Sequence, residues 1–179
     1  SGIAEGESVT VVDDDAKMFR FFSDLLPDFK DRNVRKKKNA QAGMSDEEIY
    51  VDMCTYQAKF IFIADFADFA THVMHPTDAG DVRAFVENIL DKGSLHNVYW
   101  AACYTQENAS KFAGTKIYDY FLKYKTGIHF GGNVIEQKIM NFDYVPYAEQ
   151  KKSQKPGIGM LPVNDYEDVC KVVVPLVKG

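Results

Sequence analysis

Cysteine is scarce in this chain, and its scarcity limits the chemistry that the chain can perform. The 179 residues include three cysteines, Cys54, Cys103 and Cys170, which lie far apart without the spacing of metal ligands. Cys103 and Cys170 fall in apolar, strand-like runs, where buried thiols are common. The sequence therefore indicates no cysteine-ligated metal, and a reducing cytosol fits its cysteine usage best.

Long hydrophobic runs are also missing, because every apolar stretch is far too short to span a bilayer. With 46% hydrophobic and 26% charged residues, the composition is that of an ordinary globular protein, and one soluble domain over residues 1–179 is expected. The net charge of -5 argues against a generic nucleic-acid coat. The chain opens on Ser1 without a starting methionine or a signal peptide, so we expect a piece of a longer protein.

Apolar periodicity and capping residues predict alternating helices and strands. Helices are expected from the Asp13-Asp14-Asp15 cap to Pro27, then at 28–41, at 45–56 behind a capping box at Ser45, at 78–93 capped by Asp78, at 115–125 and briefly at 134–140. Strands are expected at 7–12, 59–64, 97–103 and 127–130, with an antiparallel hairpin of 158–163 and 169–176. Loops are expected at 65–77 and 144–157.

The runs at 59–64 and 97–103 are apolar with almost no alternation. Such runs are typical of parallel strands that helices cover on both faces. Two of them joined by a helix make a right-handed βαβ unit. The sequence therefore predicts an α/β fold in three layers, with a parallel sheet between helices.

A carboxylate stands at the end of the first of these strands. The run Phe60 to Phe69 delivers Asp65 there, as the strands of P-loop ATPases deliver the acid that holds magnesium. No G-x-x-x-x-G-K-[ST] loop, which would cradle the phosphates, occurs anywhere in the chain. Asp65 is therefore a candidate nucleotide-site acid with an equally weighted alternative as a helix cap, whereas Asp68 is expected to be a local cap.

Other polar groups suggest sites less strongly. His72, His75 and Asp78 follow each other at helical spacing, but Pro76 breaks the helix that would bring them together, so no metal site is predicted. The basic run Arg32 to Lys38 is interpreted as a solvated helix face, with contact to an acidic partner as the alternative. Gly131-Gly132 is interpreted as a tight turn rather than a phosphate loop.

Several aromatic side chains fall where a surface is expected. Tyr118, Phe121 and Tyr124 share one helix, and Tyr144 and Tyr147 lie in a long loop. Tyrosine suits partner recognition because it buries much area with little loss of side-chain entropy. These five residues are the predicted partner-binding set, and core packing is the alternative for those on the helix.

The order of these landmarks resembles the later part of an FtsK/SpoIIIE-type ATPase domain. The resemblance covers nearly the whole chain: an Asp-rich helix start, a basic helix, the strand ending at Asp65, a strand ending near Thr105-Gln106, and a terminal hairpin entered at Gly157-Ile158-Gly159. More specifically, the chain is similar to the C-terminal ATPase domain of EssC- or YukB-type motors of type VII secretion. The match depends on the order of these loose motifs.

This resemblance implies a P-loop NTPase-like (RecA/FtsK-like) fold, degenerate or truncated at its N-terminus, because the Walker A position would lie upstream of residue 1. Placing Asp65 at the magnesium position puts Phe66 where the water-activating glutamate belongs. The other register puts Asp65 at the glutamate position and Ala64 at the metal position. Either way the acidic pair is incomplete, so efficient hydrolysis is not expected.

The resemblance further implies a degenerate ATPase-fold domain that acts by binding. Its expected partners are neighbouring ATPase domains and small helical-hairpin secreted proteins of the WXG class, at the cytoplasmic face of the plasma membrane within a membrane-anchored parent. ATP and Mg²⁺ are expected only in that parent, and no cofactor or nucleic acid is assigned to this chain. Two alternatives stay open: an active ATPase whose Walker A loop lies upstream, and a DNA-translocase module, which the acidic charge disfavours.

Overall fold

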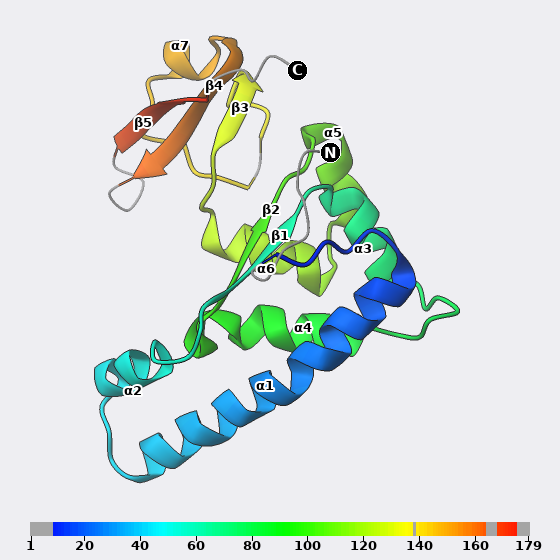
Figure 1. Cartoon of the computed structure of the whole chain (residues 1–179). Coiled ribbons are helices and arrows are strands. Elements are labelled where there is room, and N and C mark those ends of the chain that lie inside the picture. The colour runs from blue at the N-terminus through cyan, green and yellow to red at the C-terminus, as the bar shows by residue number, and fades with distance from the viewer. Residues whose placement is uncertain (1–8, 138, 164–167, 175–179) are drawn as a thin grey trace. The chain divides into compact units, whose positions relative to one another are not determined.

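The structure, a computed structural model, describes residues 9–137, 139–163 and 168–174. Two compact units make up the chain, Ser1–Ile117 and Tyr118–Gly179. The first holds a parallel pair of strands with most of the helices, and the second holds an antiparallel three-stranded sheet (Figure 1). The mixed α/β class is confirmed, while the single domain and the three-layer P-loop fold stay predictions.

The first unit alternates helices with its two strands. Its elements are α1 (Asp15–Gln41), α2 (Asp46–Met53), β1 (Lys59–Ile63), α3 (Phe66–Met74), α4 (Arg83–Lys92), the 3-10 helix η1 (Gly93–His96), β2 (Val98–Ala102), α5 (Gln106–Ala109), the 3-10 helix η2 (Ser110–Phe112) and the start of α6 (Lys116–Tyr124). β1 and β2 pair in parallel, which confirms the predicted pairing of these two segments. None of the helices in the described part of the chain combines the length and the apolar character that crossing a bilayer requires.

Two helix starts follow the chemistry of their first residues. Asp14 caps α1 by accepting a hydrogen bond from the Lys17 amide at 2.7 Å. Ser45 and Glu48 form the predicted capping box of α2, with the Glu48 carboxylate 2.8 Å from the Ser45 amide. Pro27 was expected to kink or restart the helix, and the restart is wrong, because α1 runs through the proline as one helix of 27 residues. The buried apolar face of the helix continues on both sides of the proline and outweighs one lost backbone hydrogen bond.

The stretch after β1 differs from its prediction. Residues 66–74 form α3, where a loop was expected, because Asp65 caps the helix and Pro76 lies beyond its end. Asp78 does not start the next helix. α4 begins at Arg83, whose amide donates to Asp81 at 2.9 Å. One histidine-rich segment thus holds an additional amphipathic helix.

Helices cover one face of the parallel pair. Trp100 of β2 stacks on Phe22 of α1 with ring centroids 6.0 Å apart, and it also contacts Phe69 of α3 at 6.3 Å. Ile63 and Val98 are buried on this covered face. Because side chains alternate along a strand, the residues between them point to the opposite face.

The second unit is built around β3 (His129–Gly132), β4 (Gln154–Val163) and β5 (Asp168–Val173), paired in that order. The predicted hairpin is confirmed over the described residues, since β4 and β5 pair in antiparallel fashion from Ile158↔Val173 to Val163↔Asp168. Its expected last residues, 175 and 176, lie outside the described part of the chain. The expected loop 144–157 contains the short helix α7 (Tyr147–Gln150) and the start of β4.

The predicted helix at 134–140 is wrong. The Gln137 side chain accepts from the Met140 amide at 2.8 Å and donates to the Met140 carbonyl at 2.6 Å, so it holds this segment in turns. Val134, Phe142, Val145 and Met160 pack together as the core of this unit. A polar side chain thus supplies locally the hydrogen bonds that a helix would have supplied.

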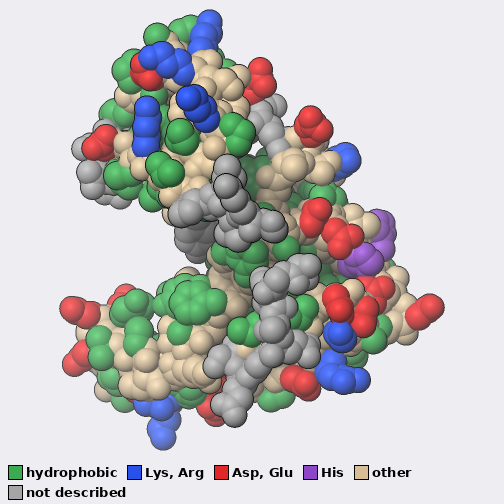
Figure 2. All heavy atoms as spheres, turned by 45° about the horizontal axis from the view of Figure 1, so that its top comes forward, with side chains coloured by type: hydrophobic (Ala, Val, Ile, Leu, Met, Phe, Trp, Pro, Cys, Tyr) green, Lys and Arg blue, Asp and Glu red, His purple; other side chains and the backbone are tan. Residues whose placement is uncertain are grey.

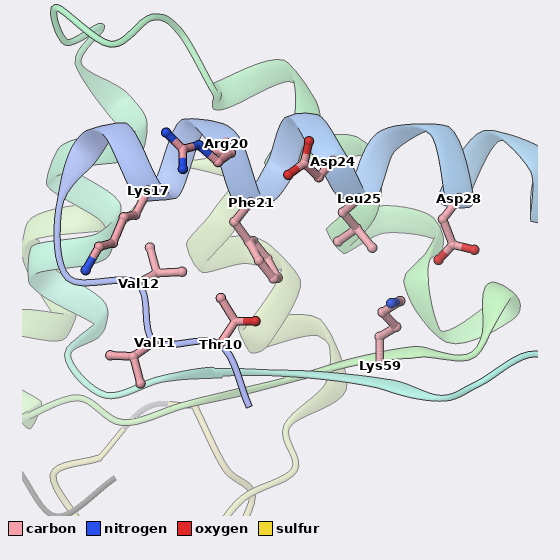
Figure 3. Close-up of a pocket in the computed structure, with 10 residues that line it drawn as sticks. All are labelled: Thr10, Val11, Val12, Lys17, Arg20, Phe21, Asp24, Leu25, Asp28 and Lys59. Carbon is pink, nitrogen blue, oxygen red and sulfur yellow. The ribbon is translucent and has the colours of Figure 1, made fainter. Parts of the chain in front are cut away.

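The predicted strand at 7–12 has its first two residues outside the described part of the chain. Thr10, Val11 and Val12 run beside α1 without belonging to a strand. Phe21 and Leu25 point from α1 toward this segment and toward Lys59 of β1 (Figure 3). Together they line a cavity of about 390 Å³ that also exposes Lys17, Arg20, Asp24 and Asp28.

Candidate functional site

The carboxyl end of β1 carries the acid that the sequence singles out. Asp65 is exposed, and its Oδ1 accepts hydrogen bonds from the Ala67 amide at 2.9 Å and the Asp68 amide at 3.1 Å. These two amides are among the unpaired donors at the start of α3. The cap alternative for Asp65 is therefore confirmed by geometry, and one of its oxygens is already engaged in the fold.

Beside this cap, a histidine joins two helices. His72 of α3 places Nδ1 2.6 Å from Oδ1 of Asp15 in α1, and its Nε2 lies 3.5 Å from Oδ1 of Asp68. The predicted neighbours His75 and Asp78 do not take part in this contact. Across the described ranges, no group of three or more histidine, cysteine, aspartate or glutamate side chains is arranged to hold a metal ion.

The basic run at 32–38 is not uniformly solvated. Arg32 is 1% exposed, and its guanidinium donates to the carbonyls of His96 at 2.8 Å and Gln57 at 3.0 Å, beside an ion pair with Asp28 at 2.9 Å. The prediction of a solvated face is wrong at this residue, because carbonyl groups of two other segments, η1 and the residues before β1, meet this side of α1 and accept hydrogen bonds from Arg32. Arg35, one turn on, pairs with Asp52 at the surface.

The face of β1 and β2 opposite the helices is open and aromatic. Phe60 is 78% exposed and Phe62 is 61% exposed, and the strand register sets them beside Tyr99 and the exposed Ala101. Phe60 and Tyr99 stack with ring centroids 5.3 Å apart and planes 24° from parallel. We call these four residues the open face.

The open face extends toward α2 through Tyr50. Hydrogen bonding to Tyr99 and to Cys54 raises the pKa of the Tyr50 phenol, and the bond to Tyr99 joins Tyr50 to the open face. Tyr50 is 55% exposed and Val51 beside it is also exposed. Aromatic surface is thus continuous from the amino end of the strands onto the neighbouring helix.

Figure 2 shows exposed hydrophobic side chains in the lower part of the view, with acidic side chains to the left and right of them. Monomeric proteins seldom expose contiguous apolar surface without a binding role. Parallel strands are in addition almost always covered on both faces. The open face is therefore the candidate binding site of the first unit.

The five predicted partner-binding aromatics all belong to the second unit. Tyr144 and Tyr147 are each 62% exposed, and the Lys151 ammonium lies 4.2 Å above the Tyr147 ring. Tyr118 is buried and Phe121 is half-buried. The side chain of Tyr124 lies outside the described residues. Among the four whose side chains are described, the loop tyrosines Tyr144 and Tyr147 alone have the exposure that the prediction requires.

Other sequence candidates find structural roles. Cys103 and Cys170 are exposed, against the expectation of buried thiols, because Cys103 follows the end of β2 and Cys170 alternates with Val169, which packs against the core of the second unit. Gly131 and Gly132 adopt positive φ angles of 66° and 53° at a register shift between β3 and β4. Both glycines belong to β3, so the expected tight turn is not formed at this pair, and an irregularity within the sheet accounts for their conformation.

The open face was missed because the apolar run at 59–64 was interpreted as buried on both sides. One signal in the sequence does separate the two faces. Along Phe60-Ile61-Phe62-Ile63, aromatic and aliphatic residues alternate with the period of a strand. The aliphatic residues Ile61 and Ile63 lie on the helix-covered face, and the aromatic residues Phe60 and Phe62 lie on the open face.

Comparisons of the chain with protein families, with curated proteins and with solved structures found no match. The fold and the site therefore define the class of protein by themselves. It is a mixed α/β protein with a parallel strand pair that is helix-covered on one face and exposes aromatic rings on the other.

Proposed function

We propose that the chain is a degenerate ATPase-fold domain of the FtsK/SpoIIIE type that works by binding other proteins in a type VII secretion motor. Its partners would be neighbouring ATPase domains or helical-hairpin secreted proteins of the WXG class. The motif order described above supports the family. The exposure of Phe60 and Phe62 on a parallel strand pair is the observation that carries the binding role.

The surroundings of Asp65 support a role other than hydrolysis. Its Oδ1 is engaged by two amides at the start of α3, and the chain holds no Walker A lysine. In-line phosphoryl transfer needs a phosphate cradle, a metal and an oriented water together. A domain that lacks the cradle and uses its remaining acid as a helix cap is better suited to binding than to turnover.

Calorimetric titration with Mg-ATP tests the inactive part of the proposal. We expect no heat of binding at millimolar nucleotide for the chain, for Asp65→Ala or for Asp65→Asn. Asparagine caps helices as well as aspartate but carries no charge for a metal, so the two variants separate capping from coordination. Heat that both variants abolish would instead favour an ATPase whose Walker A loop lies upstream.

Titration with a purified helical-hairpin secreted protein of the WXG class tests the binding part. We expect saturable binding that is weakened but not abolished by salt, because apolar anchors and complementary charges both contribute to it. A chain that binds neither this protein nor a sister ATPase domain contradicts the proposal. Affinity for duplex DNA that falls steeply with salt would favour the translocase alternative.

A further inference from the structure

The occupant of the open face is constrained by the strands beneath it. Five-residue strands are roughly 17 Å long, and three turns of an α-helix rise about 16 Å. The covered face of the same pair already packs against α1 and α3 through Trp100. An extended strand would pair with an edge of the sheet, whereas this surface consists of side chains that stand away from the backbone.

The relief of the open face also suits a helix. Phe62 on β1 stands beside Ala101 on β2, so a large and a small side chain are neighbours in the register. Phe60 and Tyr99 form a stacked wall next to this step. A bulky aliphatic side chain on a helix could pack over Ala101 between these rings, as knobs pack into holes elsewhere in proteins.

Charge constrains the ends of the occupant. At the amino end of the strands, the first turn of α2 contains the exposed residues Asp46, Glu47 and Glu48. At the carboxyl end, exposed Asp65 lies two residues beyond β1, where it caps α3. Lys59 does not offset them on this side, because it lines the cavity on the helix-covered side. A partner with cations flanking its apolar stripe would match these acids.

From these observations we infer that the open face binds a basic amphipathic α-helix of a protein partner, about three turns long along its apolar stripe. This inference rests on the proposed binding function and names the chemistry of the partner. Phe60, Phe62 and Tyr99 are the apolar anchors, and the acids at both ends of the strands set the orientation and exclude acidic helices. Tyr50 extends the apolar contact onto α2.

Fluorescence anisotropy with a labelled synthetic helix tests the inference on the full chain. The probe is a leucine-lysine peptide of about 18 residues with leucines at i, i+3, i+4 and i+7. One comparison peptide scatters the same leucines, and another replaces lysine by glutamate. We expect the striped cationic peptide to bind at least about tenfold more tightly than either comparison.

Phe60→Ser combined with Phe62→Ser should weaken that binding by about tenfold or more, since both anchors are lost. Phe130→Ser, which alters an exposed aromatic of the second unit, is the matched control and should bind as the wild type does. Trp100 fluorescence reports whether the double variant keeps the packing of the covered face. If the double variant does not fold, Ala101→Trp is tested in its place. The indole would fill the space over Ala101 beside Phe62 and should also prevent the peptide from binding.

Equal binding of the double variant and the wild type would overturn the inference. Equal binding of the striped and the scattered peptide would also overturn it, because charge attraction alone would then explain the binding. If the chain dimerises through the open face and the peptide does not dissociate the dimer, the inference is overturned and the face binds a second copy of the chain instead. Binding of a helical-hairpin protein that survives the double variant would sink the helix site while leaving the proposed function intact.

Discussion

At the scale of single residues, His96 couples the fold to pH. The side chain is 1% exposed, its Nδ1 lies 2.7 Å from the Lys92 carbonyl, and the Phe29 ring lies 4.7 Å from it. Burial lowers the pKa of His96, and the hydrogen bond to the Lys92 carbonyl, which raises the pKa, only partly opposes this effect. The folded chain therefore holds this imidazole neutral, with its proton on Nδ1.

The sign of the effect follows from proton binding. Once unfolded, His96 takes up a proton near its ordinary pKa of about 6.5, so the unfolded state binds more protons below that value. The stabilising effect is complete above this pH and is lost as the pH falls toward the lowered pKa of the folded state. Urea unfolding followed by Trp100 fluorescence should therefore show a lower free energy of unfolding at about pH 5.5 than at about pH 7.5.

His96→Gln should flatten this dependence, while His75→Gln, at an exposed histidine, should leave it as in the wild type. The carboxylates Asp52 and Glu87 titrate below this window, because ion pairing lowers their pKa values. The assignment is wrong if His96→Gln keeps the full pH dependence.

At the scale of elements, Gly159 shows how β3 and β4 fit together. A Cβ atom there would lie 2.5 Å from Cγ2 of Ile128 and 2.8 Å from Cε1 of Phe130. Gly159→Ala should destabilise the second unit by about 1–3 kcal/mol through overpacking. Hydrogen exchange of the β4 amides would detect this loss as reduced protection.

A matched background isolates the cause. In a chain carrying Ile128→Ala and Phe130→Ala, the atoms that would clash are gone, so Gly159→Ala should cost much less there. An equal cost in both backgrounds would mean that the glycine matters for its backbone and not for the close approach of these two side chains. The Gly157-Ile158-Gly159 motif would then need another explanation.

Elements also show how far a sequence can be interpreted. Capping residues located α1 and α2, and apolar runs located β1, β2 and the β4–β5 hairpin, because these signals are local. The helix at 66–74 was not predicted, because 65–77 was interpreted as one loop containing Pro76, whereas α3 ends before that proline. The burial of Arg32 was not predicted, because its hydrogen-bond acceptors, the carbonyls of His96 and Gln57, come from segments far along the chain.

At the scale of the whole molecule, Arg32 tests whether the two units unfold separately. Its guanidinium donates hydrogen bonds to the carbonyls of Gln57 and His96, which belong to the first unit. Arg32→Met would leave these buried carbonyls unpaired, so we expect a loss of about 3 kcal/mol in the transition seen by Trp100. Arg35→Met, on the same helix at an exposed ion pair, should cost much less.

The stability of the second unit should not change in Arg32→Met. Hydrogen-exchange protection of the β4 and β5 amides is expected to stay at its wild-type level in Arg32→Met. A parallel loss of protection there would show that the chain unfolds as one cooperative body. Trp100, the only tryptophan in the chain, makes the first transition separately visible.

The pairing of β1 with β2 also has a consequence for how the chain folds. Each residue of β1 meets one about 40 positions further along, so a long loop must close before this pair forms. The neighbouring strands β4 and β5 are joined by a short connection and pair locally. Topology of this kind slows folding, so the parallel pair is expected to form later than the β4–β5 hairpin.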